Sequence, residues 1–321
     1  MDAPDQYSSQ PAGQRIKEMA FRMGFEACGF ARAQPVNDAK GTLYHKWILS
    51  GYHGKMEYLN RNTEKRLDPR LLVPGAKTVI CLAFNYHQED FQPSDAYYRV
   101  SQYAAGIDYH HVLKKKLYQL LEYVKEFYPG ASGRVFTDSA PVLERYWAQQ
   151  AGLGSPGKNT CLILPRKGSY YFLAEMIVDI DLPPDAPAVK DPCGNCTRCM
   201  QACPTQAIVA PGVLDARKCT SYLTIELKDA LPEDLRGNTK KYIFGCDICQ
   251  QVCPHNIKFA APCTEKDFKP LASIARWSRL DWESMDKVAW RRNFVKTGSP
   301  MARASFEKLR DNMDAAANQE R

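Results

Sequence analysis

The chain has 321 residues, of which 45% are hydrophobic and 25% are charged, and its formal net charge is +7. This length suits about two globular domains of roughly 100–200 residues each. No apolar run approaches the ~20 residues of a membrane-spanning helix, and the first residues show neither a secretory nor a twin-arginine signal. We therefore expect a cytoplasmic protein with no membrane partner.

Helices and short strands alternate through the first part of the chain. Apolar residues at helical spacing predict a helix that Gly24 ends, followed by a short strand over 27–30. Further helices are expected near 43–50 and 56–60, and a buried strand over 78–84. Asp108 is a good N-cap for a long helix that Pro129 and Gly130 end.

The alternation continues with a strand over 134–137, a helix over 141–150, and strands over 161–164 and 170–180. It predicts an α/β domain over residues 1–181. A proline-rich linker covers 182–192, and a cysteine-rich module covers 193–263. We expect the rest, 264–321, to be a helical segment that packs on the core and has a fraying polar end.

Twelve cysteines in a cytoplasmic chain favour metal ligation over disulfides. A first run, C-x2-C-x2-C-x3-C-P, is that of bacterial ferredoxins, and a second run, C-x2-C-x3-C-P, is one cysteine short. The first run consists of Cys193, Cys196, Cys199 and Cys203, and the second of Cys246, Cys249 and Cys253. These spacings predict a ferredoxin-like module with two 4Fe–4S clusters; zinc ribbons also use paired C-x2-C spacing, but they require no Cys-Pro crossovers.

The last cysteine of each run is expected to ligate the other cluster. Cluster one then takes Cys193, Cys196, Cys199 and Cys253. Cluster two takes Cys203, Cys246 and Cys249, and the isolated Cys219 is the candidate for its fourth ligand. Of the cysteines outside these sets, Cys81 and Cys161 fall in apolar strands, where we expect them to be core residues.

The α/β domain has no dinucleotide-binding or P-loop glycine motif, although it should house the chemistry that the clusters supply. Asp138 follows a predicted strand, where ligands gather in open α/β sheets, but its pattern alone favours a cap or turn residue. Asp108 and His110 begin a D-x-H-x-x-G cobalamin motif, in which Leu113 replaces the glycine. We interpret Asp108 as a cap and the histidine as a first-turn residue.

Several longer motifs occur in a fixed order along the chain. They are RLDPRLLVPGAK at 66–77, YAAGIDYH at 103–110, TDSAPVLER at 137–145, GKNT at 157–160, CTSYLTIE at 219–226 and GCDICQ at 245–250. Together with the cysteine runs, they resemble the epoxyqueuosine reductase family, whose members act in the last step of queuosine biosynthesis in tRNA. The resemblance covers residues from about 15 to 260.

The resemblance implies an oxidoreductase that reduces epoxyqueuosine to queuosine at the wobble position of tRNA with a GUN anticodon. It implies base-off cobalamin without a histidine ligand, two 4Fe–4S clusters and an external electron donor. The cobalamin domain should be an α/β/α sandwich like those of reductive dehalogenases and nitroreductases, and the protein a monomer. Asp138 becomes the proton donor, and cofactor contacts are implied at Arg66, Ser101, Asp138, Lys158, Asn159, Thr160, Glu226 and Asp247.

Three features concern the tRNA and the pocket rim. The family often has cysteine at the position of Ser101 and tryptophan-isoleucine at the position of Ser155 and Pro156. Residues 264–321 are too few for the helical-repeat extension that some members carry. Candidate anticodon-loop contacts are basic and aromatic: Lys55, Arg61, Lys65, Tyr97, Tyr98 and Arg99.

Two alternatives remain at this point. A corrinoid reductive dehalogenase shares the arrangement of a corrinoid with two clusters, although such enzymes usually carry a twin-arginine signal. A non-catalytic ferredoxin-type electron carrier would bind neither a corrinoid nor tRNA.

Overall fold

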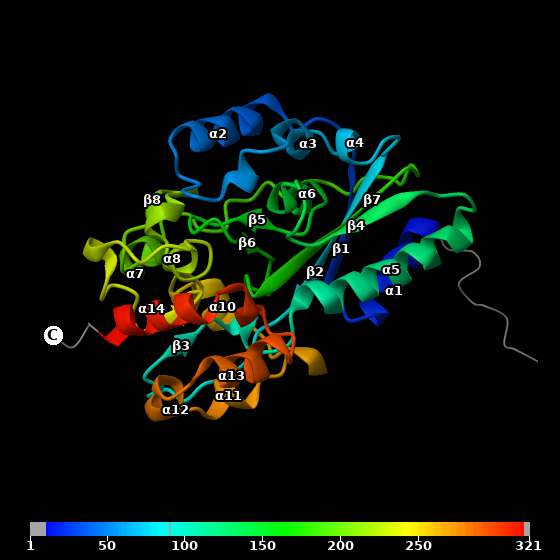
Figure 1. Cartoon of the computed structure of the whole chain (residues 1–321). Coiled ribbons are helices and arrows are strands. Elements are labelled where there is room, and N and C mark those ends of the chain that lie inside the picture. Colours follow the sequence, from blue (N-terminus) through cyan, green and yellow to red (C-terminus); the bar gives the residue numbers. More distant parts are fainter. Residues whose placement is uncertain (1–10, 90, 318–321) are drawn as a thin grey trace, which may run out of the picture.

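The computed structural model describes residues 11–89 and 91–317. Its N-terminal part is built around a four-stranded sheet in the order β1-β2-β7-β4 (Figure 1). All three strand pairs are antiparallel. The strands are β1 (Ala27–Arg32), β2 (Thr78–Asn85), β4 (Gly133–Phe136) and β7 (Tyr171–Val178).

Helices lie on both faces of this sheet. α1 (Ala12–Arg22) and α5 (Tyr109–Phe127) pack together on one face, and α6 (Glu144–Gln150) covers the other. β2 is buried along its whole length, and its side chains point alternately to the two faces of the sheet. Ile80, Leu82 and Phe84 belong to the core on one face. Val79, Cys81 and Ala83 belong to the core on the other.

The long helix α5 begins where the sequence predicts it. The side chain of Asp108 accepts a hydrogen bond from the backbone N–H of His110, as an N-cap does. Apolar residues at helical spacing, among them Leu113, Leu117, Leu120 and Val124, are buried against the sheet. The helix ends at Phe127, before Pro129 and Gly130, as expected.

Two expected elements differ from the structure in their bounds. α6 begins at Glu144 instead of 141, because two tight turns, Ser139 N–H to Thr137 C=O and Val142 N–H to Ala140 C=O, occupy the preceding residues. β6 (Leu162–Ile163) is shorter than the expected strand over 161–164 and pairs with β5 (Ser155–Pro156). The first difference leaves Asp138 in a turn after β4, where the sequence pattern places it, and the second leaves Cys161 outside the strand in which we expected it.

One segment, residues 38–72, lies outside the sheet (Figure 1). It contains α2 (Asp38–Leu49), α3 (Thr63–Leu67) and α4 (Pro69–Leu72). The expected helix over 56–60 is a short 3-10 turn, Glu57–Leu59.

The cysteine-rich module consists of short elements. Its helices are α7 (Arg198–Ala202), α8 (Thr220–Ile225), α9 (Ile248–Gln251) and α10 (Pro254–Phe259), and its strands are β8 (Ile208–Ala210), β9 (Val213–Leu214) and β10 (Tyr242–Phe244). β10 pairs in parallel with β3 (Arg99–Val100), so backbone hydrogen bonds join the module to the N-terminal part.

The C-terminal segment wraps this junction (Figure 1). Trp282, Phe294 and Met301 share a buried core with Phe244 of β10 and Val100 of β3. Its helices are α11 (Ala272–Arg276), α12 (Arg279–Glu283), α13 (Lys287–Trp290), a π-helical turn (Arg291–Val295) and α14 (Phe306–Ala317). The polar end expected to fray lies beyond residue 317, outside the described residues. Over residues 11–89 and 91–317, no helix has the length and apolar character to cross a lipid bilayer.

Candidate active site and cluster module

Asp138 stands in a turn at the end of β4. Thr137 before it is buried and donates its hydroxyl hydrogen bond to the carbonyl of Leu173 on β7, at 2.9 Å, which anchors the turn to the sheet. Asp138 itself adopts a left-handed backbone with φ of +56°, and 58% of its side chain is exposed. We expected a ligand site at Asp138 because ligands gather at the carboxyl ends of parallel strands. This sheet is antiparallel, so that rule does not apply to it.

The first turn of α5 supplies the partners of this carboxylate. The hydroxyl of Tyr109 donates a hydrogen bond to Oδ2 of Asp138, and Nε2 of His110 lies 3.8 Å from the same oxygen. The pattern indicated only first-turn residues here, so the sequence analysis missed both side chains as site residues. Tyr109 and His110 nevertheless lie inside the motif at 103–110, which could have signalled them.

Asp108, the cap of α5, orders this group through two partners. Its Oδ1 lies 2.8 Å from Nδ1 of His110, and its Oδ2 accepts a hydrogen bond at 2.9 Å from Arg303 in the C-terminal segment. Burial alone would raise the pKa of Asp108, but the hydrogen bonds from His110 and the charge of Arg303 hold it below its ordinary value. No sequence motif marked Arg303.

Two expected cofactor contacts, Arg66 and Glu226, lie together with Asp138 around the side chain of Tyr58. Burial, and then the carboxylates of Glu226 and Asp138, raise the pKa of Tyr58, while the cations Arg66 and Arg303 oppose the shift. These charges come from four separate segments, so the fold brings them together. Arg66 is 7% exposed, and its Nε has no hydrogen-bond partner within the described chain.

Ser101 and Asp247, also expected contacts, are bonded to each other. The hydroxyl of Ser101 and, at 2.8 Å, the backbone N–H of Gln102 both donate to the Asp247 carboxylate. Burial raises the pKa of Asp247 to about 6, although both hydrogen bonds act in the opposite direction. A hydroxyl at position 101 thus replaces the frequent cysteine and still makes a polar contact.

The turn formed by Lys158, Asn159 and Thr160 bridges the two halves of the molecule. The backbone N–H of Lys158 lies 3.4 Å from the sulfur of Cys193, and the amide of Asn159 donates to the carbonyl of Cys249 at 3.4 Å. On its other side, Arg145 of α6 donates to the carbonyl of Thr160 at 2.9 Å. The turn therefore contacts both cysteine runs and the helix behind Asp138.

The thiols form two neighbourhoods, and each neighbourhood contains cysteines from both runs. Burial raises the pKa of Cys193, and the thiol of Cys253 from the second run adds to the rise. Burial likewise raises the pKa of Cys246, with further contributions from Cys219 and from Cys203 of the first run. Cys203 and Cys219 therefore lie beside Cys246, and Cys253 lies beside Cys193.

Within residues 11–89 and 91–317, no three Cys, His, Asp or Glu side chains converge on a point where one metal ion would bind. The four thiolates of a 4Fe–4S cluster each bind a different iron, so they surround a volume instead of a point. Two groups of neighbouring thiols, spread around a volume, are compatible with such clusters.

Cys161 differs from our expectation, whereas Cys81 is fully buried as expected. Because β6 starts at Leu162, Cys161 remains in the preceding turn, where it is half-buried. A hydrogen bond with Cys249 lowers the pKa of its thiol. Cys161 is therefore a neighbour of the second cysteine run and not a core residue.

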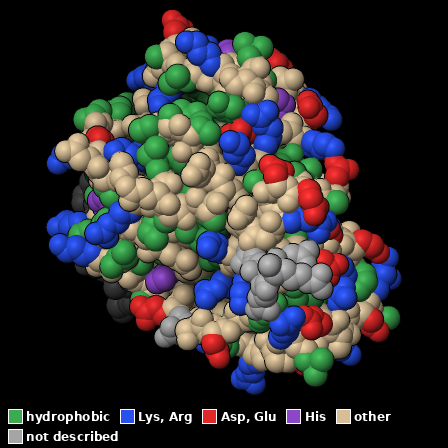
Figure 2. All heavy atoms as spheres, turned by 90° about the vertical axis from the view of Figure 1, so that its left-hand side faces the viewer, with side chains coloured by type: hydrophobic (Ala, Val, Ile, Leu, Met, Phe, Trp, Pro, Cys, Tyr) green, Lys and Arg blue, Asp and Glu red, His purple; other side chains and the backbone are tan. Residues whose placement is uncertain are grey.

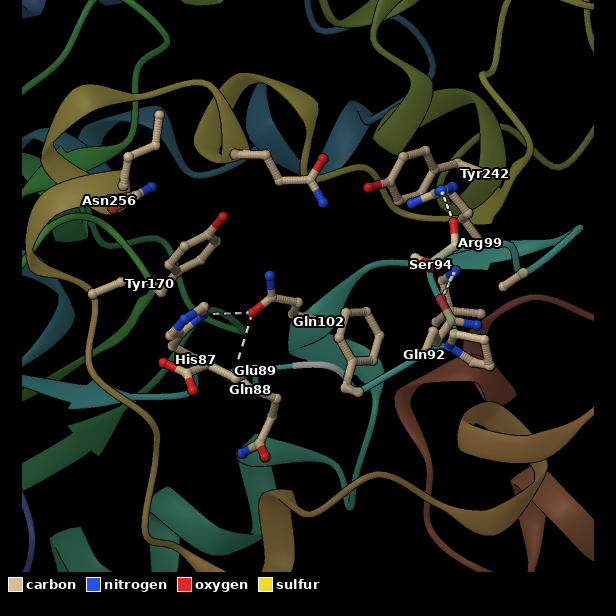
Figure 3. A pocket seen from close by; sticks show the side chains of 17 residues that line it. His87, Gln88, Glu89, Gln92, Ser94, Arg99, Gln102, Tyr170, Tyr242 and Asn256 are labelled. Atoms are coloured by element: carbon tan, nitrogen blue, oxygen red, sulfur yellow. Dashed lines mark hydrogen bonds between the residues drawn. The ribbon is translucent and has the colours of Figure 1, made fainter.

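A cavity of about 500 Å³ lies between residues 87–102 and the helices α9 and α10 (Figure 3). The side chain of Gln102 accepts a hydrogen bond from the backbone N–H of Gln88 and lies 2.9 Å from Nδ1 of His87, whose ring stacks on Tyr170. The backbone N–H of Gln102 bonds to Asp247, so this residue separates the cavity from the Ser101–Asp247 pair. Asp138 does not line the cavity.

One expected anticodon contact is wrong. Tyr98 is only 3% exposed, lies in the core shared with the C-terminal segment, and donates to Glu283 at 3.1 Å, so its ring cannot stack on a base. Lys55 is exposed and paired with Asp229.

The fold and the site define a class of protein, an α/β catalytic unit joined to a double-cluster ferredoxin module. A family model described as a 4Fe–4S double cluster binding domain matches residues 192–256, and one described as epoxyqueuosine reductase QueG, DUF1730, matches residues 66–139. The epoxyqueuosine reductase of Cellulophaga algicola is 45% identical over 299 residues, which cover 93% of this chain and 96% of that protein. The chain belongs to the epoxyqueuosine reductase family.

Other relatives and solved structures agree. The epoxyqueuosine reductase of Pseudomonas aeruginosa is 41% identical and matches 94% of this chain and 83% of its own. A crystal structure of a selenomethionine-labelled epoxyqueuosine reductase superposes with a TM-score of 0.87 at 30% identity, covering 95% of this chain and 81% of that one. A second, with an epoxyqueuosine-modified tRNA stem loop, has a TM-score of 0.85 at 30% identity and covers 95% and 80%. This membership decides against the dehalogenase and electron-carrier alternatives.

Proposed function

We propose that this chain reduces epoxyqueuosine to queuosine at the wobble position of tRNA with a GUN anticodon, in the cytoplasm, with electrons from an external donor. Family membership supports the reaction, and a relative's structure with an epoxyqueuosine-modified tRNA stem loop supports the substrate. The observation that carries the proposal is the Asp138 turn, which presents a solvent-accessible carboxyl bonded to Tyr109.

Two 4Fe–4S clusters fit the two thiol neighbourhoods. We assign Cys193, Cys196, Cys199 and Cys253 to cluster one, and Cys203, Cys219, Cys246 and Cys249 to cluster two. Cys219 is the N-cap of α8 and Glu226 is its C-cap, so a helix of about 9 Å connects Cys219 to the group around Tyr58. We therefore place cluster two between cluster one and the site of the reaction.

Cobalamin, in its base-off form, would lie between the α/β unit and the cluster module. The Nε of the buried Arg66 has no hydrogen-bond partner among the described residues. Because buried polar groups normally have a partner, this N–H is available to donate to a ligand. Arg66, the Ser101–Asp247 pair, the turn from Lys158 to Thr160 and Glu226 would hold the cofactor. When bound, cobalamin would supply the reducing centre at which the epoxide C–O bond is broken.

The chain's own residues handle the proton. Conversion of an epoxide to an alkene releases its oxygen as water and consumes two electrons and two protons. Asp138 would donate a proton to the departing oxygen as a general acid. Tyr109 orients this carboxyl through its hydrogen bond to Oδ2, and the bonded pair of Asp108 and Arg303 fixes the start of the helix that carries Tyr109.

We also propose a finer architecture. The placement of α1 and α5 on one face of the sheet and α6 on the other supports an α/β/α sandwich of the reductive-dehalogenase and nitroreductase type. The units would be the α/β domain (1–181), the linker (182–192), the cluster module (193–263) and the C-terminal segment (264–321). We propose that the protein is a monomer.

The test is turnover by the complete chain. Anaerobically purified protein with reconstituted clusters should change the absorption spectrum of added cobalamin. With a reductant and tRNA carrying epoxyqueuosine, nucleoside mass spectrometry should then show the loss of one oxygen atom from the modified base. Conversion that needs no cobalamin, or no conversion by protein with full clusters and bound corrinoid, would overturn the proposal.

A further inference from the structure

Two carboxyl groups behind the Asp138 turn are not used by the reaction as described above. Glu144 opens α6, and its Oε1 accepts a hydrogen bond from the backbone N–H of Asp138. This bond holds the backbone of Asp138 and leaves its carboxyl to Tyr109 and to the exposed side of the turn. The next residue of the helix, Arg145, is held at the turn that contacts both cysteine runs.

Glu175 lies deeper, in the centre of β7. Its register partners are Cys81 on β2 and Phe136 on β4, and both belong to the core on the α6 side of the sheet. The side chain is fully buried, and its carboxyl lies against that of Glu144 without a hydrogen bond of good geometry to any residue in 11–89 or 91–317. A carboxyl group in such a place is costly unless it keeps its proton or has a specific use.

We propose that Glu144 is a positioning residue for the reaction. Its carboxyl holds the Asp138 turn in the conformation that presents the Asp138 carboxyl to Tyr109, and we call this contact the latch. The buried carboxyl of Glu175 lies against Glu144 and supports it from the sheet side. The inference rests on the proposed function, because it takes Asp138 as the proton donor.

The Asp138 turn needs such a latch for two reasons. A left-handed backbone costs free energy for any residue with a Cβ, although aspartate tolerates it better than most, so contacts around the turn must favour it. A relative of 30% identity and TM-score 0.83 has a structure described as having its catalytic aspartate loop swung out of the active site. A loop that can leave the site in that protein calls for a contact that retains it.

The charges around Glu144 decide which form of its carboxyl makes the contact. It faces Asp138 from the turn, Arg145 from its own helix, Glu175 from β7 and Cys81 from β2. Burial and the charge of Asp138 raise the pKa of Glu144, although the Asp138 N–H and Arg145 oppose the rise. The Asp138 N–H bonds to an oxygen acceptor of this side chain, and the amide of glutamine offers an acceptor of nearly the same shape without a negative charge.

Hydrogen exchange on the complete, cluster-loaded chain tests the latch directly. The amide of Asp138 should be protected in wild type and in Glu144→Gln, and should exchange roughly tenfold faster or more in Glu144→Ala. Glu126→Gln, which changes an exposed glutamate on α5, should leave that amide unchanged. Iron content and circular dichroism should match wild type in all variants. Equal protection of this amide in wild type and Glu144→Ala would overturn the latch.

Turnover separates this inference from the proposed function. Glu144→Ala should lower single-turnover rates on the order of 10- to 100-fold at saturating tRNA, with little change in tRNA affinity, and Glu144→Gln should restore most of the rate. A large loss in Glu144→Gln would contradict the latch, because that variant keeps the acceptor. If the exchange pattern holds but wild type does not reduce epoxyqueuosine, the latch stands and the proposed function fails.

Discussion

Asp138 combines an exposed carboxyl with a firmly held backbone. Its oxygens face Tyr109 and His110, whereas its N–H is bonded to Glu144. A group in this position can reach a substrate without losing the contacts that orient it. An exposed carboxyl oriented by Tyr109 on a fixed main chain suits a general acid that must meet a leaving oxygen at one angle.

Asp138→Asn should separate acid catalysis from binding. Asparagine keeps the size and a hydrogen-bonding group but cannot supply an acidic proton, so turnover should fall roughly 10²–10⁴-fold. Binding of cobalamin, measured by absorption, and of tRNA should stay close to wild type, and the bound corrinoid should remain reducible. Loss of cobalamin would instead mark Asp138 as structural, and wild-type turnover would assign the acid to another group.

Cys219 is the residue on which the assignment of cluster two depends. It lies near Cys203 and Cys246, outside both runs. Cys219→Ala should reduce iron from about eight to about four per chain, because a 4Fe–4S cluster needs four ligands. Cys28→Ala and Cys263→Ala are matched controls that should keep full iron. Full iron and an unaltered reduced EPR spectrum in Cys219→Ala would refute the assignment.

At the scale of elements, β7 joins the cores on the two faces of the sheet. It pairs with both β2 and β4, and it carries Glu175 into an otherwise apolar layer below α6. Burial, and then the charge of Glu144, raise the pKa of Glu175 well above its ordinary value. β7 therefore carries a carboxyl whose protonated form is favoured in the folded protein, whereas in the unfolded chain it ionises at lower pH.

This difference makes stability depend on pH in a definite direction. An unfolded glutamate loses its proton above about pH 4.3, whereas the raised pKa values of Glu144 and Glu175 keep both protons bound to higher pH in the folded protein. Folding takes up protons in this window, so stability should fall as pH rises through it, by about 1.4 kcal/mol per pH unit for each group.

Thermal unfolding of wild type and Glu175→Gln between about pH 5.5 and about pH 7.5 checks this expectation. The melting temperature of wild type should decline more steeply than that of the variant, which has one titrating group fewer. Glu126→Gln should follow wild type, because that side chain is exposed. Parallel declines in wild type and Glu175→Gln would contradict a proton held at Glu175.

At the scale of the whole molecule, the C-terminal segment links the units. Its core residues pack on β10 and β3, and its Arg303 reaches Asp108 at the start of α5. On the face that Figure 2 shows, Lys and Arg side chains of the described residues are interspersed with Asp and Glu. Binding of a polyanion there should rest on a few phosphate contacts.

The salt dependence of tRNA binding measures those contacts. Affinity should fall linearly on a log–log plot against salt, with a slope of about −0.7 to −0.9 per phosphate contact, because bound counterions are released. With a net charge of +7 spread among acidic groups, we expect only a handful of contacts. A matched duplex RNA should bind more weakly than the tRNA. Affinity that does not change with salt would contradict phosphate contacts.

Local chemistry determined much of this protein from its sequence. Some features depend only on neighbours within a few residues, so the sequence alone predicts them. They are the periodicity of α1 and α5, the Asp108 cap, the buried strand β2 and the two cysteine runs. The longer motifs likewise identified the family that the comparisons show.

The tertiary structure alone decided which distant groups meet. Arg303, Tyr58 and Glu175 belong to no motif that marks a site, yet they lie beside Asp108, Arg66 and Glu144 because separate segments pack around one sheet and one cluster module. Likewise, Cys161 reads as a core residue within its apolar run, but a turn one residue longer leaves it beside Cys249. Burial and charge act through space, so no local pattern could have specified these contacts.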